Sequence, residues 1–334
     1  MKLKKKGIFF TFIAVLMIAV LVFMLSPKSE ISVKKNDLSE TVRLESVNKL
    51  VNSLSGSLTK TIADATVYRA LLSMTLYINK TGKYLDIENF DRYVADITQN
   101  GTLNGTNIDS LTGQKIMENM TLKNWTSRIV TIANSTFRVN LSGYEINVTI
   151  YQVQPWKIEI FIIANYTVIA ETATWQGPTA ISSQLEIEGM TDPYYLRESN
   201  GMIPRTISRT DLQYYRWNIS NLRSHVENAT YIHWPFSQAP SFLMRFVNKT
   251  DNSTCCGIES VVNPNEITNP DREGSYVDYL FFSNRFTQAN CTKVYNITNP
   301  GISEGLWDEF PFLKLDLENV ARYNVTFADR IISC

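Results

Sequence analysis

Residues 144–168, YEINVTIYQVQPWKIEIFIIANYTV, decide the fold class of this chain. Apolar side chains alternate with polar ones along both halves of the stretch, and Pro155 separates the halves. Because successive side chains of a strand point to opposite faces, a period of two predicts two strands, each with one apolar and one polar face. We therefore expect an antiparallel sheet with one buried face.

The alternation assigns each side chain of the stretch to a face. The expected inward residues are Tyr144, Ile146, Val148, Ile150, Ile158, Ile160, Ile162, Ala164, Tyr166 and Val168. Two N-glycosylation motifs, at Asn147 and Asn165, fall on the polar faces. This agreement between pattern and motif is typical of a glycosylated sheet with one solvated side.

A long amphipathic stalk helix is expected within residues 28–80. Asp37 with Glu40 three residues later matches a capping box, and apolar residues from Leu38 to Ile78 recur at spacings of three to five. Gly56 is expected to weaken the helix locally, because glycine is a poor helix former. The apolar stripe packs either on the chain's own globular part or against neighbouring subunits.

The chain begins with a basic head and an unbroken apolar run. Residues 7–25 contain no charge, and at 1.5 Å per residue they would form a helix of about 28 Å, enough to cross a bilayer. Four lysines precede the run, which places the N-terminus in the cytoplasm and residues 28–334 outside the cell. We expect a single-pass protein of the cell membrane that contacts lipid through residues 7–25. A cleaved secretory signal is the other reading, although no A-x-A-like site precedes Pro27.

Lys4-Lys5-Lys6-Gly7, followed by an apolar run that starts at Ile8, resembles the class III signal of type IV pilins and their archaeal pilin-like relatives. The resemblance implies cleavage between Gly7 and Ile8, and packing against copies of the chain or other pilin-like subunits. It covers about 25 of the 334 residues. Phe12 stands where many pilins carry a glutamate, so the contact attributed to that carboxylate is missing. Residues 187–193 and 255–259 are also similar to segments of large uncharacterised archaeal surface proteins.

Composition favours a glycoprotein and excludes nucleic-acid binding by charge. The formal net charge is zero, and because residues 1–35 carry seven Lys and one Glu, the rest of the chain is mildly acidic. Sixteen N-x-[ST] motifs occur, where independent placement predicts about five. The expected acceptors of N-linked glycans are Asn79, Asn100, Asn104, Asn119, Asn124, Asn134, Asn140, Asn147, Asn165, Asn218, Asn228, Asn248, Asn252, Asn290, Asn296 and Asn324.

The four cysteines, Cys255, Cys256, Cys291 and Cys334, all lie in the last third of the chain. An even number of cysteines outside the cell predicts two disulfides. Adjacent cysteines rarely bridge one another, so we expect Cys255 and Cys256 to bond one each to Cys291 and Cys334. A zinc site fits this spacing badly.

Catalytic signals are sparse. The two histidines, His225 and His233, stand alone and are expected to be structural. The adjacent acids Asp308 and Glu309 are typical of a solvated turn, and no nucleophile, phosphate-binding or metalloprotease motif occurs. We therefore expect no catalytic residue, no cofactor and no metal.

The expected fold is α+β: an N-terminal transmembrane helix, a long amphipathic stalk helix, and an extracellular head with an antiparallel β-sheet and flanking helices. The expected parts are residues 1–27, 28–80, 81–192 and 193–334, the last stapled by disulfides. The expected function is a membrane-anchored, N-glycosylated, pilin-like surface protein with a structural or adhesive role in a filament or envelope.

Two alternatives remain. One is a membrane-tethered extracellular enzyme acting on glycans or peptides, and the other is a static single-pass surface glycoprotein without pilin processing. A cleft lined by two carboxylates, or by the histidines and an acid, would favour the enzyme.

Overall fold

The computed structural model describes residues 35–171, 173–213, 216–235, 237–249, 253, 255–268, 274–282, 292–297, 309–325 and 327–333. The chain forms two compact units, Met1–Ser46 and Val47–Cys334. In the first unit the described residues are the beginning of one helix. The second unit contains the sheets and the polar clusters described below. The part boundaries expected at residues 80 and 192 stay predictions.

Two helices occupy most of the segment that was expected to form one stalk helix. They are α2 (Lys35–Leu54) and α3 (Ser57–Thr81), and the interruption falls at Gly56, where the backbone leaves the helical region. The buried side of α3, which includes Val67 and Met74, packs against β4, β6 and neighbouring helices. Of the two alternatives for the apolar stripe, packing on the chain's own globular part therefore describes α3.

The structure corrects the expected membrane topology. No helix in the described part of the chain, which begins at residue 35, combines the length and the apolar character needed to cross a membrane. The longest helices, α2 and α3, carry charged side chains along their length, which the bilayer interior disfavours. On this finding the expected transmembrane helix and the expected single-pass membrane localisation are wrong. Residues 7–25 lie outside the described residues, as do Gly7 and Ile8, and the pilin-type cleavage stays a prediction.

Short elements connect α3 to the main sheet. They are η1 (Ile87–Asn89), α4 (Phe90–Asn100), β1 (Thr102–Leu103), β2 (Thr106–Asn107), α5 (Ile108–Thr112), α6 (Leu122–Ile132) and η2 (Ala133–Phe137). The α4 helix ends at Gly101, whose φ of 69° is a left-handed conformation that favours glycine. The α6 helix begins where the Thr121 hydroxyl accepts a hydrogen bond from the Asn124 amide at 3.2 Å.

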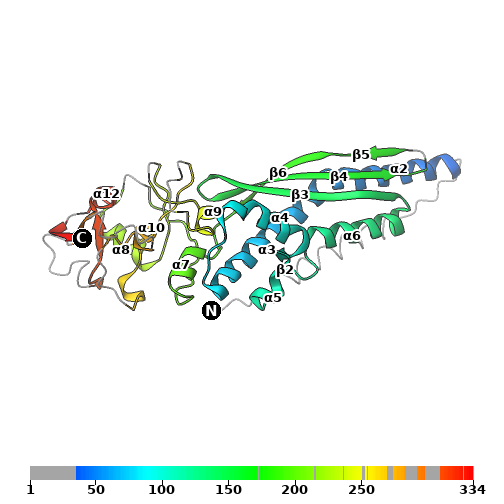
Figure 1. Cartoon of the computed structure of the whole chain (residues 1–334). Helices are drawn as coiled ribbons and strands as arrows, with labels where there is room; N and C mark the ends of the chain where they lie inside the picture. Colours follow the sequence, from blue (N-terminus) through cyan, green and yellow to red (C-terminus); the bar gives the residue numbers. More distant parts are fainter. Residues whose placement is uncertain are drawn as a thin grey trace, which may run out of the picture. The chain divides into compact units, whose positions relative to one another are not determined.

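The main sheet is an antiparallel meander around β4. The strands β3 (Asn140–Gln154) and β4 (Lys157–Ile169) pair along almost their whole length. On the other side of β4 lie β6 (Thr179–Glu186) and β5 (Thr174–Gln176), each paired antiparallel to it. Figure 1 shows α3, α4 and α6 along one face of this sheet.

Burial along β3 and β4 follows the alternation that the sequence predicts. Every expected inward residue, from Tyr144 to Ile150 and from Ile158 to Val168, is buried. The outer face, which we define by Asn140, Asn147, Phe161, Ile163, Asn165 and Ile169, carries the exposed or half-buried side chains of both strands. Asn147 and Asn165 lie on this outer face, as expected.

The remaining elements form a second mixed region. They are α7 (Pro193–Glu198), α8 (Ile219–Glu227), α9 (Phe242–Arg245), η3 (Pro264–Glu266), α10 (Asp278–Phe282), β7 (Thr292–Ile297), β8 (Lys314–Asp316), α12 (Leu317–Arg322) and β9 (Phe327–Ser333). The strand β7 pairs antiparallel with both β8 and β9. The helix α10 occupies most of the aromatic-rich run 276–282. A short aromatic run has no period that separates a buried strand from a buried helix.

Candidate functional site

A pocket of about 610 Å³ lies where the turn between β3 and β4 meets three later segments of the chain. Its volume is in the range of small-molecule sites in proteins. It is lined by Trp156, Glu188, Arg209, Thr210, Asp211, Leu212, Gln213, Ile232 and His233. The lining thus combines an indole ring, two carboxylates, a guanidinium, an amide and an imidazole.

Backbone hydrogen bonds hold the pocket walls in place. The Thr210 amide donates to the Tyr231 carbonyl at 2.9 Å, and the Tyr231 amide donates to the Ser208 carbonyl at 2.8 Å. Ile232 and Glu259 exchange two backbone hydrogen bonds of 2.9 Å each. Because these pairings fix the segments that carry the lining side chains, the pocket is formed before any ligand arrives.

Arg209 and Trp156 form a cation–π pair in the lining. The guanidinium carbon of Arg209 lies 5.4 Å from the centroid of the Trp156 ring, a cation–π distance. The backbone amide of Arg209 also donates to Glu188 Oε1 at 3.1 Å. Stacking restrains the guanidinium while its N–H groups stay able to donate hydrogen bonds.

One hydrogen bond defines the tautomer of the His233 ring, which lines the pocket. Its Nδ1 lies 2.7 Å from the carbonyl oxygen of Gly257, which only accepts hydrogen bonds, so Nδ1 carries the proton. In the neutral ring, Nε2 is then an acceptor. The expectation that both histidines are structural describes His225 better, because His225 is buried with Nδ1 2.6 Å from the Thr230 hydroxyl. Burial lowers the pKa of His225 to about 3.

A fully buried ion cluster contacts Tyr231, which directly precedes the lining residue Ile232. The Arg245 guanidinium contacts Asp192 Oδ2 and Asp278 Oδ2, each at 2.7 Å, and all three side chains have no solvent exposure. Tyr231 donates from its hydroxyl to Asp192 at 2.8 Å, and Arg245 also donates to the Ile258 carbonyl. Burial raises the pKa of Asp278, and the charge of Arg245 opposes this shift.

Arg245 also joins the two segments, residues 187–193 and 255–259, for which a resemblance to surface proteins was noted. It binds Asp192 in the first and the carbonyl of Ile258 in the second. The cluster has the composition of a structural ion network: removing one partner would leave a buried charge uncompensated.

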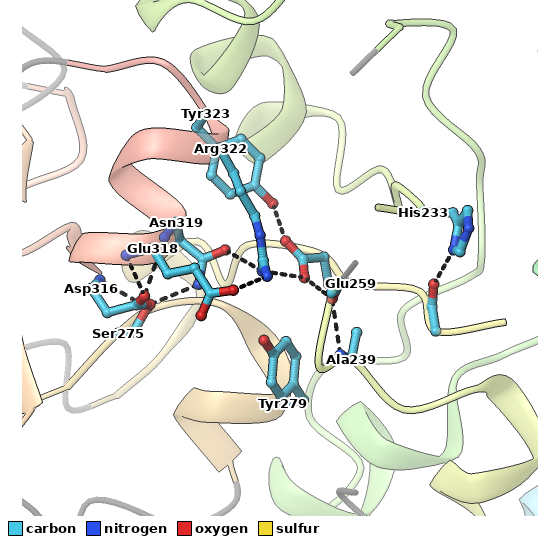
Figure 2. A network of polar contacts seen from close by, with 12 residues as sticks. His233, Ala239, Glu259, Ser275, Tyr279, Asp316, Glu318, Asn319, Arg322 and Tyr323 are labelled. Atoms are coloured by element: carbon cyan, nitrogen blue, oxygen red, sulfur yellow. Dashed lines mark hydrogen bonds and ion pairs between the residues drawn. The ribbon is translucent and has the colours of Figure 1, made fainter. Parts of the chain in front are cut away.

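A second buried cluster surrounds Glu259. Its carboxylate accepts from the Ser237 hydroxyl at 2.9 Å and from the Tyr323 hydroxyl at 3.1 Å, and Arg322 lies 3.8 Å away. Figure 2 shows Arg322 reaching from α12 between Glu318 and Glu259. Burial raises the pKa of Glu259 to about 7, and the charge of Arg322 opposes this shift. The cluster fastens α12 to Glu259, whose backbone pairs with Ile232 of the pocket lining.

The expected disulfide pairing is corrected. Cys255 is bonded to Cys256, its direct neighbour in sequence. The small ring was expected to be unfavourable, but the turn at these two residues brings the two sulfurs together. Cys291 and Cys334 lie outside the described residues. No group of three or more His, Cys, Asp or Glu side chains is placed to hold a metal in the part of the chain that the structure describes.

The adjacent acids Asp308 and Glu309 do not line the pocket as far as the structure describes them. Glu309 forms an ion pair with Arg223, and Asp308 lies outside the described residues. The sequence did not indicate the pocket acids Glu188 and Asp211. Each is an isolated acid outside any known catalytic or binding motif.

The expected glycan acceptors lie on the surface wherever the structure describes them. Eleven are exposed, namely Asn79, Asn100, Asn104, Asn119, Asn134, Asn140, Asn147, Asn218, Asn228, Asn248 and Asn324. Asn124, Asn165 and Asn296 are half-buried. Asn252 and Asn290 lie outside the described residues. None of the described acceptors is therefore hidden from a modifying enzyme by its burial.

Comparison with known proteins gives no relative for this chain: no family model, no curated protein and no solved structure matches it.

Proposed function

We propose that this chain is an N-glycosylated protein with a structural or adhesive role, and that it binds its partner through the pocket between Trp156 and His233. The pocket is the observation that carries the proposal, because it offers a preformed binding site of about 610 Å³. The surface position of the described acceptors and the Cys255–Cys256 disulfide support a glycosylating and oxidising compartment.

The pocket chemistry fits an uncharged ligand that is rich in hydroxyl groups, such as a neutral saccharide. Arg209 offers donors, whereas Glu188, Asp211 and Nε2 of His233 offer acceptors. A hydroxyl group both donates and accepts, so it satisfies partners of either kind. An anion would face the two carboxylates, and a cation would face the guanidinium stacked on Trp156, whereas an uncharged ligand is repelled by neither group. The indole of Trp156 supplies an apolar surface for the carbon skeleton of such a ligand.

Titration calorimetry on the full chain tests the proposal with a panel of neutral, acidic and basic oligosaccharides. We expect binding of neutral members, and a loss of at least about tenfold in affinity for Asp211→Asn, which removes a charged acceptor. Asp91→Asn is the matched control, because Asp91 is exposed on α4 and does not line the pocket. Equal affinity of the two variants, or binding of charged members alone, contradicts the proposal.

An enzyme acting on glycans or peptides is the second candidate, and one observation favours it. The pocket gathers His233 with the carboxylates of Glu188 and Asp211, which is a set of groups used in acid–base catalysis. Mass analysis of the oligosaccharides and of a peptide panel after incubation separates the two functions. Unchanged ligands after binding support adhesion, and cleaved products support the enzyme.

A further inference from the structure

The outer face of the main sheet exposes a row of large apolar side chains. Phe161 and Ile163 are each 38% exposed and Ile169 is 42% exposed, all on β4. Their partners on the next strands are small: Phe161 pairs with Ser182 and Ile163 with Ala180 on β6, and Ile169 pairs with Thr174 on β5. Adjacent exposed apolar residues on a strand are a liability for aggregation unless something covers them.

Glycan acceptors lie in register with these residues. Asn147 on β3 is directly opposite Ile163, and Asn140 on β3 is directly opposite Ile169. Asn165 lies on the same side of β4, two positions after Ile163. Directly opposed side chains in an antiparallel pair are about 5 Å apart at Cβ, and diagonal ones about 7–8 Å, so a sugar on each acceptor would contact the apolar row.

Along β4 the outer-face residues change from polar near the β3–β4 turn to apolar beside the acceptors. Near the β3–β4 turn, Lys157 forms an ion pair with Glu186 at 3.0 Å, and Gln184 donates to Glu159. These polar residues lie at that end of β4 and β6, whereas Tyr151 and Val153 of β3 are 43% and 51% exposed there. Large apolar residues appear on β4 where the acceptors begin.

The amide nitrogens of the three acceptors are available for modification. None of Asn140, Asn147 and Asn165 donates a hydrogen bond from Nδ2 to the described residues, and Gln99 fixes the other end of Asn147 by donating to Oδ1 at 3.3 Å. In contrast, Nδ2 donates a hydrogen bond to the Trp217 carbonyl in Asn324 and to Ser224 in Asn228. The outer-face acceptors therefore offer free nitrogens.

We infer that N-linked glycans on Asn140, Asn147 and Asn165 cover Phe161, Ile163 and Ile169, and so keep the outer face from associating with other chains. The inference rests on the glycosylation in the proposed function. In the transfer, Nδ2 bonds to the anomeric carbon of a lipid-linked glycosyl phosphate donor, loses one proton, and the donor's phosphate leaves. The sugar's carbon-bound hydrogens then pack on the apolar row while its hydroxyls face water.

The test compares the glycosylated full chain with a triple variant, Asn140→Gln, Asn147→Gln and Asn165→Gln. We expect the triple variant to bind a hydrophobic dye severalfold more strongly and to self-associate in sedimentation velocity. Asn79→Gln is the matched control, since Asn79 is an exposed acceptor in the last turn of α3, and α3 packs on the buried side of the sheet. Unchanged dye binding and sedimentation in the triple variant overturn the inference.

Two further measurements separate the glycan from the side chain and from the proposed function. In protein made without glycosylation, the triple substitution is expected to change nothing, and adding Phe161→Thr and Ile163→Thr is expected to lower dye binding. Glycopeptide mapping that finds sugars elsewhere but not at the three sites overturns this inference alone. An unmodified chain overturns the glycoprotein proposal as well, whereas pocket binding is measured independently.

Discussion

His233 donates from Nδ1 to the carbonyl oxygen of Gly257 at 2.7 Å. Gly257 directly follows the Cys255–Cys256 disulfide, and a Cβ at this position would lie 2.2 Å from the carbonyl oxygen of Ala239. The imidazole in the pocket is therefore positioned by a backbone segment that has no room for a side chain.

Gly257→Ala is expected to lower the free energy of unfolding by about 1–3 kcal/mol, because two backbone segments have to separate to admit the methyl group. Urea unfolding measures this change, with Gln238→Ala at a neighbouring exposed position as the control. A variant as stable as the control would show that the close approach to Ala239 does not exist in solution.

Arg245→Met is expected to destabilise the chain by about 3–5 kcal/mol, since it leaves Asp192 and Asp278 buried without a counter-charge. Lys60→Met breaks the exposed ion pair with Asp64 and is expected to cost about 0.3–0.5 kcal/mol. Thermal or urea unfolding of both variants makes the comparison. Similar losses in the two would contradict the burial of the cluster.

Glu259 is expected to make stability fall as pH rises from about 4.5 to about 7. Burial raises its pKa from 4.5 to about 7, so over this range the folded chain keeps a proton that the unfolded chain has released. The stabilisation is complete below pH 4.5 and about 3 kcal/mol smaller above pH 7. Unfolding of wild type and Glu259→Gln at pH 5 and pH 8 isolates the effect. Parallel pH profiles in the two proteins would rule it out.

His225 is expected to act in the opposite direction on acidification. Burial lowers its pKa from 6.5 to about 3, so below pH 6.5 the unfolded chain binds a proton that the folded chain excludes. The resulting loss of stability is about 2 kcal/mol at pH 5. His225→Gln is expected to remove this loss, measured as the difference in unfolding free energy between pH 7.5 and pH 5. An equal loss of unfolding free energy in the variant and the wild type would refute this prediction.

Ile162 and Ile163 are neighbours in sequence on opposite faces of β4. Ile162→Ala is expected to cost about 2–5 kcal/mol because Ile162 is fully buried, whereas Ile163→Ala is expected to cost less than about 1 kcal/mol. Denaturant unfolding of the unglycosylated chain compares the two without interference from sugars. A larger cost for Ile163→Ala would reverse the assignment of the faces.

The sequence predicts those features that depend on local patterns. The alternation between Tyr144 and Val168 predicts both strands and their buried face, whereas the single stalk helix that was expected is interrupted at Gly56. The strand prediction succeeds because the side-chain period acts over a few residues. The pocket depends on long-range packing: Trp156, Arg209 and His233 come from separate segments, and none of them has a distinctive neighbour in the sequence.

The buried ions show a second limit. Asp192 before Pro193 has the signature of a helix start, and its side chain does accept from the Tyr194 amide at 2.8 Å. Nothing local indicates that Arg245 and Asp278 also reach it. The expected cysteine pairing was wrong for a related reason, because no local pattern in the sequence indicates the turn that holds Cys255 and Cys256.

The distribution of partners along the chain also sets an order of folding during synthesis. The strands β3, β4 and β6 are sequence neighbours, so their meander is complete once residue 186 has left the ribosome. Asp192 follows at once, but Arg245 and Asp278 are made much later. Until then the carboxylate of Asp192 keeps its shell of water, since burying it unpaired is costly. The N-terminal half can therefore fold while translation continues, and the half that contains Arg245 is the last to become fixed.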